Sequence, residues 1–278
     1  MNGPRPNLLT GEELDRLSDL LRRWTGMTFG EKKRYYLERR IEDRMRRTGS
    51  SDVPAYFARL LSGESERQAL IDAMTINETY FYREDHQLAA LSQSILPDIV
   101  ARRRPGDLVR IWSLPCSTGE EGYSIAIWLL ENWPLVDAYH VEIVASDIDT
   151  TALAAARDGR YGQRALARLP AELRERYFES EHRHQRRIIQ DLRESVHFSQ
   201  VNLIDARSME AAGRFDVILC RNLLIYFDDD ARLTAAANLF GALNPGGYLC
   251  LGHSESMARI DPRFSLVRLD GAIVYHRD

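Results

Sequence analysis

From Val109 onward the chain alternates short, β-rich apolar runs with segments of helical periodicity, and this alternation constrains the fold more than any other feature. Strands buried on both faces read as continuous apolar runs, and strands joined through helices pair in parallel. The alternation therefore predicts an α/β protein with a doubly wound, mostly parallel sheet. The predicted strands are VRIWSLP, VEIVASD, VHFSQVN, FDVILCRN and GYLCLGH, with helices beginning near Tyr123 and Thr151.

Two later segments depart from this alternation. FSLVRLDGAIVYHRD holds two β-prone runs around Asp270-Gly271, a turn signal that predicts a closing antiparallel hairpin. Tyr177–Phe198 is polar, with short β-prone runs. This second segment indicates either a small inserted subdomain or an elaborated crossover.

The N-terminal part of the chain is typical of helices. Thr10 and Glu13 have the spacing of a capping box, and Gly26 is positioned to end the first helix. Apolar residues recur between them at helical spacing: Leu14, Leu17, Leu20, Leu21 and Trp24. A second, basic helix runs to Gly49, and shorter helices follow around Ala55–Leu61 and Glu64–Met74. A small all-helical domain is therefore predicted ahead of the sheet.

Length and composition exclude several classes of protein. With 278 residues the chain can form one large or two modest domains, and its net charge of −4 argues against a protein that coats nucleic acid. No apolar stretch approaches the roughly 20 residues that span a bilayer, and the N-terminus lacks a signal-peptide pattern. Cys116, Cys220 and Cys250 have neither metal-ligand nor disulfide spacing. We therefore expect a cytoplasmic protein without a metal, nucleic-acid partner or membrane insertion.

The loop CSTGEEG after the first strand constrains the ligand. Ligands of open parallel sheets bind beyond the carboxyl ends of the strands, often with phosphate at a helix N-terminus. Here Glu120 and Glu121 occupy that position, glycines are few and no P-loop lysine is present. One acid alone would only stabilise the helix start. Together these features disfavour a dinucleotide or triphosphate and favour a cationic nucleoside such as S-adenosylmethionine.

Asp147 ends the second predicted strand. Nucleoside-binding sheets place an acid at this position to accept hydrogen bonds from ribose hydroxyls. The alternative is that Asp147 caps the next helix, a task that Asp149 or Thr150 fits better.

Six segments of the chain resemble, in order and spacing, motifs of the chemotaxis receptor methyltransferases, the CheR family. They are TINETYFYRE, WSLPCSTGEEGYSIA, VASDID, FSQVNL, FDVILCRNLLIYFDDD and LGHSESM. The resemblance implies a methyltransferase fold that uses S-adenosylmethionine, an N-terminal helical domain and an inserted antiparallel β-subdomain. The corresponding limits are 1–84 for the helical domain and linker, 85–278 for the methyltransferase domain and 177–197 for the insert.

The same resemblance implies the reaction and its residues. Family members transfer a methyl group to glutamate side chains on the helical signalling domain of chemoreceptors, releasing S-adenosylhomocysteine. By resemblance, Arg83 and Tyr226 lie beside the transferred methyl. The implied cofactor-binding residues are Asn77, Thr79, Arg83, Glu121, Asp147, Asn202, Leu203, Arg221 and Asn222. A glutamate carboxylate is already ionised at neutral pH, so the reaction needs alignment and no general base.

The basic second helix is predicted to be either a solvated face or a surface for docking acidic receptor helices. Its cations are Lys32, Lys33, Arg34, Arg39, Arg40, Arg44, Arg46 and Arg47. By the same resemblance, family members that bind a receptor C-terminal tail peptide have a glycine-containing loop in the β-subdomain. The corresponding segment ESEHRHQRRIIQDLRESV lacks glycine, so we expect no binding of a tail peptide.

Three other functions remain open from the residues. They are methylation of a small molecule or nucleic acid, a non-catalytic binding module and, least favoured, an NAD-dependent dehydrogenase, since CSTGEEG is not G-x-G-x-x-G.

Overall fold

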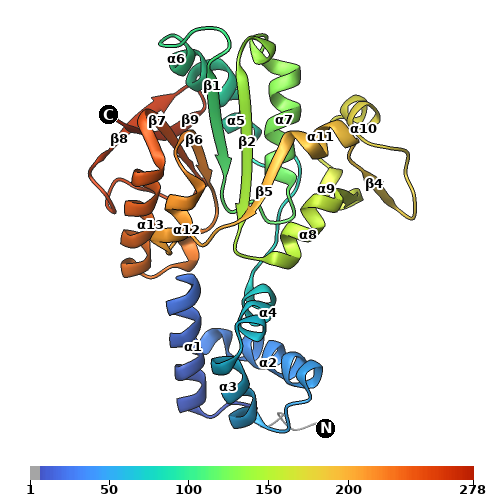
Figure 1. Cartoon of the computed structure of the whole chain (residues 1–278), viewed down its shortest axis with the longest axis vertical. Helices are drawn as coiled ribbons and strands as arrows, with labels where there is room; N and C mark the ends of the chain where they lie inside the picture. Colours follow the sequence, from blue (N-terminus) through green and yellow to red (C-terminus); the bar gives the residue numbers. More distant parts are fainter. Residues whose placement is uncertain (1–6) are drawn as a thin grey trace. The chain divides into compact units, whose positions relative to one another are not determined.

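The computed structural model describes residues 7–278 (Figure 1). The chain forms two compact units. One holds the chain up to Ile76 together with Tyr226–Ala231, and the other holds Asn77–Ile225 and Arg232–Asp278. The limits 1–84, 85–278 and 177–197 inferred from the sequence stay predictions.

Among its described residues, the first unit contains four complete α-helices. They are α1 (Gly11–Thr25), α2 (Arg34–Thr48), α3 (Val53–Ser62) and α4 (Glu64–Met74), with a 3₁₀ turn at Glu31–Lys33 before α2. The predicted capping box is confirmed, since the Glu13 amide donates to Thr10 Oγ1 and the Thr10 amide donates to a Glu13 carboxylate oxygen. Both α1 and α2 end at a glycine in the left-handed conformation, as the helix-stop signals predict.

The core of this unit is apolar, with one buried charge. Its fully buried side chains include Leu17, Leu21, Leu37, Ile41, Tyr56, Leu60 and Leu70. Glu66 of α4 is 8% exposed and accepts two hydrogen bonds from the Arg44 guanidinium, at 2.9 and 2.6 Å, and one from the Tyr56 hydroxyl at 2.9 Å. The buried carboxylate thus joins α2, α3 and α4.

The second unit contains a seven-stranded sheet in the order β5-β2-β1-β6-β7-β9-β8. The strands are β1 (Leu108–Ser113), β2 (His140–Asp147), β5 (Val196–Gln200), β6 (Phe215–Cys220), β7 (Leu243–Leu251), β8 (Phe264–Leu269) and β9 (Ala272–Arg277). Pairs from β5 through β7 are parallel, and the β8–β9 hairpin is antiparallel. The predicted doubly wound sheet with its closing hairpin is confirmed. Strand order reverses between β1 and β6, where such sheets bind ligands.

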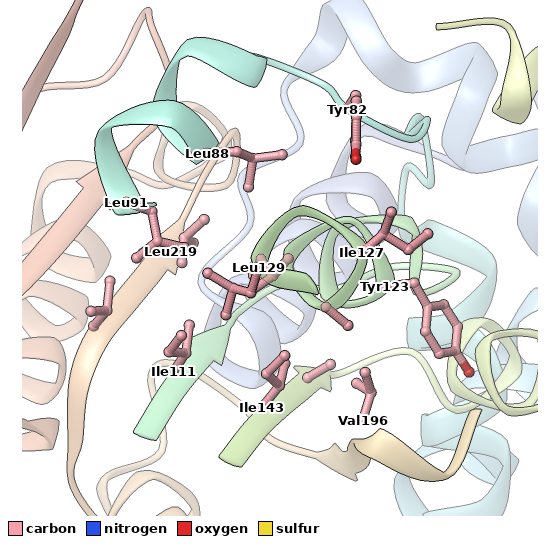
Figure 2. Packing of buried hydrophobic residues seen from close by; sticks show 14 of the residues in the cluster. Tyr82, Leu88, Leu91, Ile111, Tyr123, Ile127, Leu129, Ile143, Val196 and Leu219 are labelled. Carbon is pink, nitrogen blue, oxygen red and sulfur yellow. The ribbon is translucent and has the colours of Figure 1, made fainter. Parts of the chain in front are cut away.

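One face of the sheet packs on α7 (Glu120–Asn132) and on a helical stretch before β1 (Figure 2). Ile111, Ile143 and Leu219 from the strands meet Leu129 from α7 in this cluster. The stretch before β1 comprises α5 (Asp85–Ala90), a π-helical turn (Leu91–Ile95) and α6 (Leu96–Val100). The opposite face is also buried, because Trp112 is 0% exposed and its ring stacks on Phe215. Burial on both faces explains the continuous apolar runs.

A second, two-stranded sheet confirms the predicted antiparallel β-subdomain. Its strands are β3 (Arg160–Gly162) and β4 (Gln185–Arg187), and β3 lies ahead of the segment in which the sequence placed the insert. Short helices surround them: α9 (Gln163–Leu166), α10 (Ala171–Tyr177) and α11 (Gln190–Ser195).

The remaining helices are α8 (Thr150–Asp158), α12 (Ala206–Ala212), α13 (Asp229–Ala242) and the 3₁₀ turns Val136–Ala138 and Leu224–Tyr226. Among residues 7–278, no helix combines the length and apolarity needed to cross a bilayer.

Candidate cofactor site

The loop between β1 and α7 folds tightly onto the end of β2. The Cys116 amide donates to the Ser146 carbonyl at 2.8 Å, and Ser117 adopts a positive φ of 48°. Gly119 has a φ of 93°, and a Cβ there would lie 2.9 Å from the Ala156 Cβ. Only glycine fits that close approach. The helix begins at Glu120, three residues before the predicted Tyr123.

Asp147, at the end of β2, is buried and accepts backbone hydrogen bonds on both carboxylate oxygens. The Ser117 amide donates to one oxygen at 2.7 Å, and the Asp149 amide donates to the other at 2.9 Å. Burial raises the pKa of Asp147 to about 6, with a further contribution from the charge of Asp149, and the backbone donors only partly oppose this rise. An ionised carboxylate offers about four acceptor sites, so a hydroxyl donor can still be accepted beside the backbone donors.

Asp149 caps α8, because its carboxylate accepts the Ala152 amide at 2.8 Å. The alternative that Asp147 is the cap is therefore wrong, and capping by Asp149 is confirmed. The other oxygen of Asp149 accepts a hydrogen bond from the Asn77 side chain at 2.8 Å. The Ser117 hydroxyl donates to the Asn77 carbonyl oxygen, also at 2.8 Å. Asn77 is thereby held between the loops that follow β1 and β2.

Glu121 and Arg221 form a buried ion pair. The Arg221 guanidinium, 3% exposed, donates through Nε to Glu121 Oε2 at 2.5 Å, and Ser113 donates its hydroxyl to Glu121 Oε1 at 2.7 Å. Arg221 Nη1 also donates to the Arg83 carbonyl at 2.9 Å. The structure thus brings together Glu121, Arg221 and the Arg83 backbone, three of the predicted positions.

Glu84, the neighbour of Arg83, extends this network. Its carboxylate lies 3.8 Å from Arg221 and 3.0 Å from the imidazole of His253, and it accepts a hydrogen bond from Gln87. Burial of Glu84 acts to raise its pKa, but the hydrogen bond with His253 and the charge of Arg221 outweigh it, so the pKa lies below its usual value.

Glu120 has a separate environment from Glu121. Its side chain is buried and accepts a hydrogen bond from the Thr118 hydroxyl at 2.7 Å. Burial raises the pKa of Glu120, against the opposing effect of that hydroxyl. Thus the two adjacent acids differ, because only Glu121 has a cationic partner among the described residues.

Three other predicted residues of this unit, Asn202, Leu203 and Asn222, follow strands at the same edge of the sheet. Asn202 follows β5, and its side-chain oxygen accepts the Ile204 amide at 3.2 Å. The buried Leu203 offers its carbonyl to the Asn238 side chain. Asn222 follows β6 in the left-handed conformation, with a φ of 60°. Thr79 is half-buried in the segment after Asn77.

Tyr226 belongs to the other compact unit. Its carbonyl accepts hydrogen bonds from the Thr28 amide at 2.9 Å and from the Thr28 hydroxyl at 3.1 Å. The Lys33 ammonium lies 5.3 Å from the centre of its ring, a cation–π contact.

Two residues in this region were not assigned a role from the sequence. Glu84 joins the Arg221 network, and Glu255 accepts hydrogen bonds from the turn after β6. Glu255 lies within the quoted segment LGHSESM, which was the available signal, but a motif does not reveal which distant amides a side chain contacts.

The charges at the carboxyl ends of β1, β2 and β6 fit a cationic nucleoside better than a phosphate. Among the described residues, five carboxylates that are buried or nearly so lie near this edge: Glu84, Glu120, Glu121, Asp147 and Asp149. The buried cation beside them is the Arg221 guanidinium. A sulfonium and an ammonium suit such a donor set, and a polyphosphate would be repelled. Across residues 7–278, no cluster of three or more His, Cys, Asp or Glu side chains is arranged to hold a metal ion.

Comparison with known proteins agrees with this chemistry. Residues 77–273 match the family described as CheR methyltransferase, SAM binding domain, where SAM is S-adenosylmethionine, and residues 12–75 match its all-alpha domain. Chemotaxis protein methyltransferase 2 of Vibrio cholerae is 44% identical, over 97% of this chain and 94% of that protein. Chemotaxis protein methyltransferase 2 of Pseudomonas aeruginosa is 36% identical, over 96% and 93% respectively. Because these matches span nearly the whole chain, it belongs to the CheR family of S-adenosylmethionine-dependent methyltransferases.

Proposed function

We propose that this enzyme methylates glutamate carboxylates on the helical signalling domain of chemoreceptors, giving glutamate methyl esters and S-adenosylhomocysteine. The observation that carries the proposal is the match of residues 77–273 to the CheR methyltransferase, SAM binding domain. The acidic edge of the sheet supports the same cofactor, because it suits a nucleoside that carries positive charge and no phosphate.

In this proposal, residues that follow β1, β2 and β5 bind the cofactor, together with residues of the linker before α5. Asp147 accepts hydrogen bonds from the ribose hydroxyls after β2, while Asn77 and Thr79 cover the site from the linker. Asn202 and Leu203 border the adenine after β5. Glu121 contributes negative charge near the cationic end, moderated by its pairing with Arg221.

Arg221 and Asn222 complete the site from β6. Because the Arg221 guanidinium is already engaged by Glu121 and the Arg83 carbonyl, we assign it to positioning those groups. Asn222 then closes the site from the turn that follows.

The chain's own residues have to align an ionised carboxylate with the methyl donor and exclude water. When held by these residues, S-adenosylmethionine would supply an electrophilic methyl group, and its sulfur would be the leaving group that keeps the electron pair of the C–S bond. Arg83 is the proposed grip on the substrate. Its Nη1 donates to the Glu78 carbonyl and its guanidinium lies 5.7 Å from the Tyr80 ring centre. Its other donors have no hydrogen-bond partner among the described residues, so they are available for a carboxylate.

Tyr226 is the second proposed residue beside the transferred methyl. Its backbone is fixed by Thr28, while its hydroxyl is proposed to orient the carboxylate or the methyl group. Replacing Arg83 with alanine or Tyr226 with phenylalanine is expected to lower turnover at least about tenfold. The melting temperature of both variants is expected to stay at the wild-type value, so that the lower turnover does not reflect unfolding. Turnover at the wild-type rate in both variants would contradict these assignments.

Receptor docking is proposed on the exposed face of α2. Arg39, Arg40, Arg46 and Arg47 are exposed there. Arg44 differs from these residues, because its side chain is 15% exposed and paired with Glu66. We therefore assign Arg44 a structural role and do not include it among the docking cations. We keep the expectation that the β-subdomain binds no receptor tail peptide.

Methylation of receptors can be measured directly. We would incubate the enzyme with methyl-labelled S-adenosylmethionine and membranes that contain the chemoreceptors of the same cell. A base-labile label on a receptor band is expected, since carboxyl methyl esters hydrolyse in base. Label only on nucleic acid or a small molecule would contradict the substrate. Asp147→Asn serves as the control for cofactor binding.

A further inference from the structure

Glu255 lies in the loop after β7 and accepts four backbone hydrogen bonds on one carboxylate. The amides of Asn222 and Gly252 donate to Oε2 at 2.6 and 2.8 Å, respectively. The amides of Leu223 and Leu224 donate to Oε1 at 2.9 and 2.7 Å. These four donors use the acceptor sites that an ionised carboxylate offers. The side chain is half-buried, so water replaces such contacts poorly.

The four amides come from two loops that leave adjacent strands at the ligand edge. Strands β6 and β7 are parallel neighbours, and Cys220 pairs with Leu251 at their carboxyl ends. Asn222 follows the first of these residues by two positions, and Gly252 follows the second directly. Glu255 therefore joins the two loops at the edge where the sheet binds its ligand.

The local geometry at this junction leaves little freedom. Asn222 has a φ of 60°, in the left-handed region that asparagine adopts more readily than most residues. A Cβ on Gly252 would lie 2.7 Å from Asn222 Nδ2 and 2.7 Å from Glu255 Oε2. The Asn222 side chain thus lies directly against Gly252, and the Glu255 carboxylate fixes the backbone on both sides.

We propose that Glu255 is a positioning residue for methyl transfer. Its carboxylate holds three consecutive amides of the turn after β6, which fixes the direction of the Asn222 side chain and the start of the 3₁₀ turn Leu224–Tyr226. This role rests on the proposed function, in which Asn222 closes the cofactor site. An amide in place of this carboxylate would turn an NH₂ group toward backbone N–H donors.

The test compares Glu255→Gln with Glu255→Asp and with Glu210→Gln, an exposed control on α12. We would measure the dissociation constant for S-adenosylhomocysteine, the KM for S-adenosylmethionine and kcat. Glu255→Gln is expected to raise the dissociation constant and KM about tenfold, because several charge-assisted hydrogen bonds are lost. Glu255→Asp, which keeps the charge, is expected to fall between the glutamine variant and the wild type. Glu210→Gln is expected to match the wild type.

These readouts separate positioning from stability. A loss of stability alone reduces the active fraction and therefore kcat, while KM and the dissociation constant of the remaining active enzyme stay unchanged; that result would overturn the proposal. Amide hydrogen exchange at Asn222–Leu224 gives a second readout, and faster exchange in Glu255→Gln than in the control is expected. Unchanged exchange also overturns it. If the wild type itself binds no S-adenosylhomocysteine, that result contradicts the proposed function itself, separately from the role of Glu255.

Discussion

Each compact unit contains an arginine–glutamate pair that is largely shielded from water, Arg44–Glu66 in one and Arg221–Glu121 in the other, and the two pairs differ in their additional contacts. In the helical unit, Arg44 donates to Glu66 at 2.9 and 2.6 Å. In the sheet unit, Arg221 donates to Glu121 at 2.5 Å. The chemistry of the two contacts is the same, a charge-assisted hydrogen bond shielded from water.

The two pairs differ in the other residues that they contact. Glu66 accepts its third hydrogen bond from the Tyr56 hydroxyl, so this pair connects α2, α3 and α4 of the helical unit. Arg221 donates to the Arg83 carbonyl, so the second pair connects β6 and α7 to the linker beside the proposed reaction centre. A buried ion pair therefore does not indicate function by itself, and its other contacts decide whether its loss affects only folding.

Replacement of Arg221 with methionine is expected to have the largest effect. It leaves Glu121 buried without its cation, which costs about 3 kcal/mol of unfolding free energy, and it releases the Arg83 carbonyl. We expect the affinity for S-adenosylhomocysteine to fall more than about tenfold in the protein that remains folded. Denaturant unfolding and calorimetric titration measure the two effects. Wild-type affinity in this variant would contradict the claim that the Arg221–Glu121 pair, unlike Arg44–Glu66, supports ligand binding.

The matched variant is Arg44→Met. Because the Arg44 side chain keeps 15% exposure, we expect a smaller cost of about 2 kcal/mol in unfolding free energy. Affinity for S-adenosylhomocysteine is expected to stay at the wild-type value, since the lost contacts are to Glu66 of the same helical unit. The same titration measures this, and a reduced affinity would show that the two pairs do not differ as described.

Asp147 differs from Glu121 of the same unit, because among the described residues it has no cationic partner comparable to Arg221. With a pKa of about 6, raised by burial, only about a quarter of Asp147 is ionised at pH 5.5. If ribose hydroxyls bind the ionised form, affinity for S-adenosylhomocysteine falls about fourfold between pH 8 and 5.5. Calorimetry of the wild type and Asp147→Asn tests this, and an equal pH dependence in both would contradict it.

Through Asp147, a fall in pH is expected to weaken ligand binding but to stabilise the folded protein. Its pKa in the folded protein lies above the value of 3.8 for an unperturbed aspartate, so the folded state binds the proton more tightly than the unfolded state. This group alone therefore makes the protein more stable as the pH falls through about 6. Weaker binding at low pH is thus distinguishable from unfolding.

Arg39 and Arg40 provide the smallest expected effect and contrast with Arg44 on the same helix. Both are exposed, so reversing them to glutamate is expected to change the unfolding free energy by less than about 0.5 kcal/mol. Receptor methylation is expected to slow about twofold at low salt and to lose part of its salt dependence. Initial rates at two ionic strengths measure this, with unchanged rates and salt slope counting against docking on α2.

Local patterns predicted the elements of this protein well. The capping box of Thr10 and Glu13, the cap at Asp149 and the strands of the main sheet all depend on residues a few positions apart. Hydrophobic periodicity and capping preferences contain that information. The three-residue strand β3 was missed because so short a run has no period of its own.

Side-chain partners could not be predicted in the same way. Glu66 meets Arg44 across 22 residues, and Glu121 meets Arg221 across 100. Such contacts depend on how the elements pack, so the sequence assigned Glu121 to the cofactor without its buried partner. For the same reason it counted Arg44 among the surface cations. The site residues inferred from family resemblance stay predictions, while the contacts of Glu84 and Glu255 emerged only from the folded geometry.

The central claim is that the acidic edge of the sheet selects a cationic nucleoside over a phosphate ligand. Calorimetric titration of the wild-type protein with S-adenosylmethionine, ATP and NAD tests it most directly. We expect saturable binding of S-adenosylmethionine that weakens in Asp147→Asn, with no detectable binding of ATP or NAD. Binding of ATP or NAD as tight as that of S-adenosylmethionine would contradict the claim.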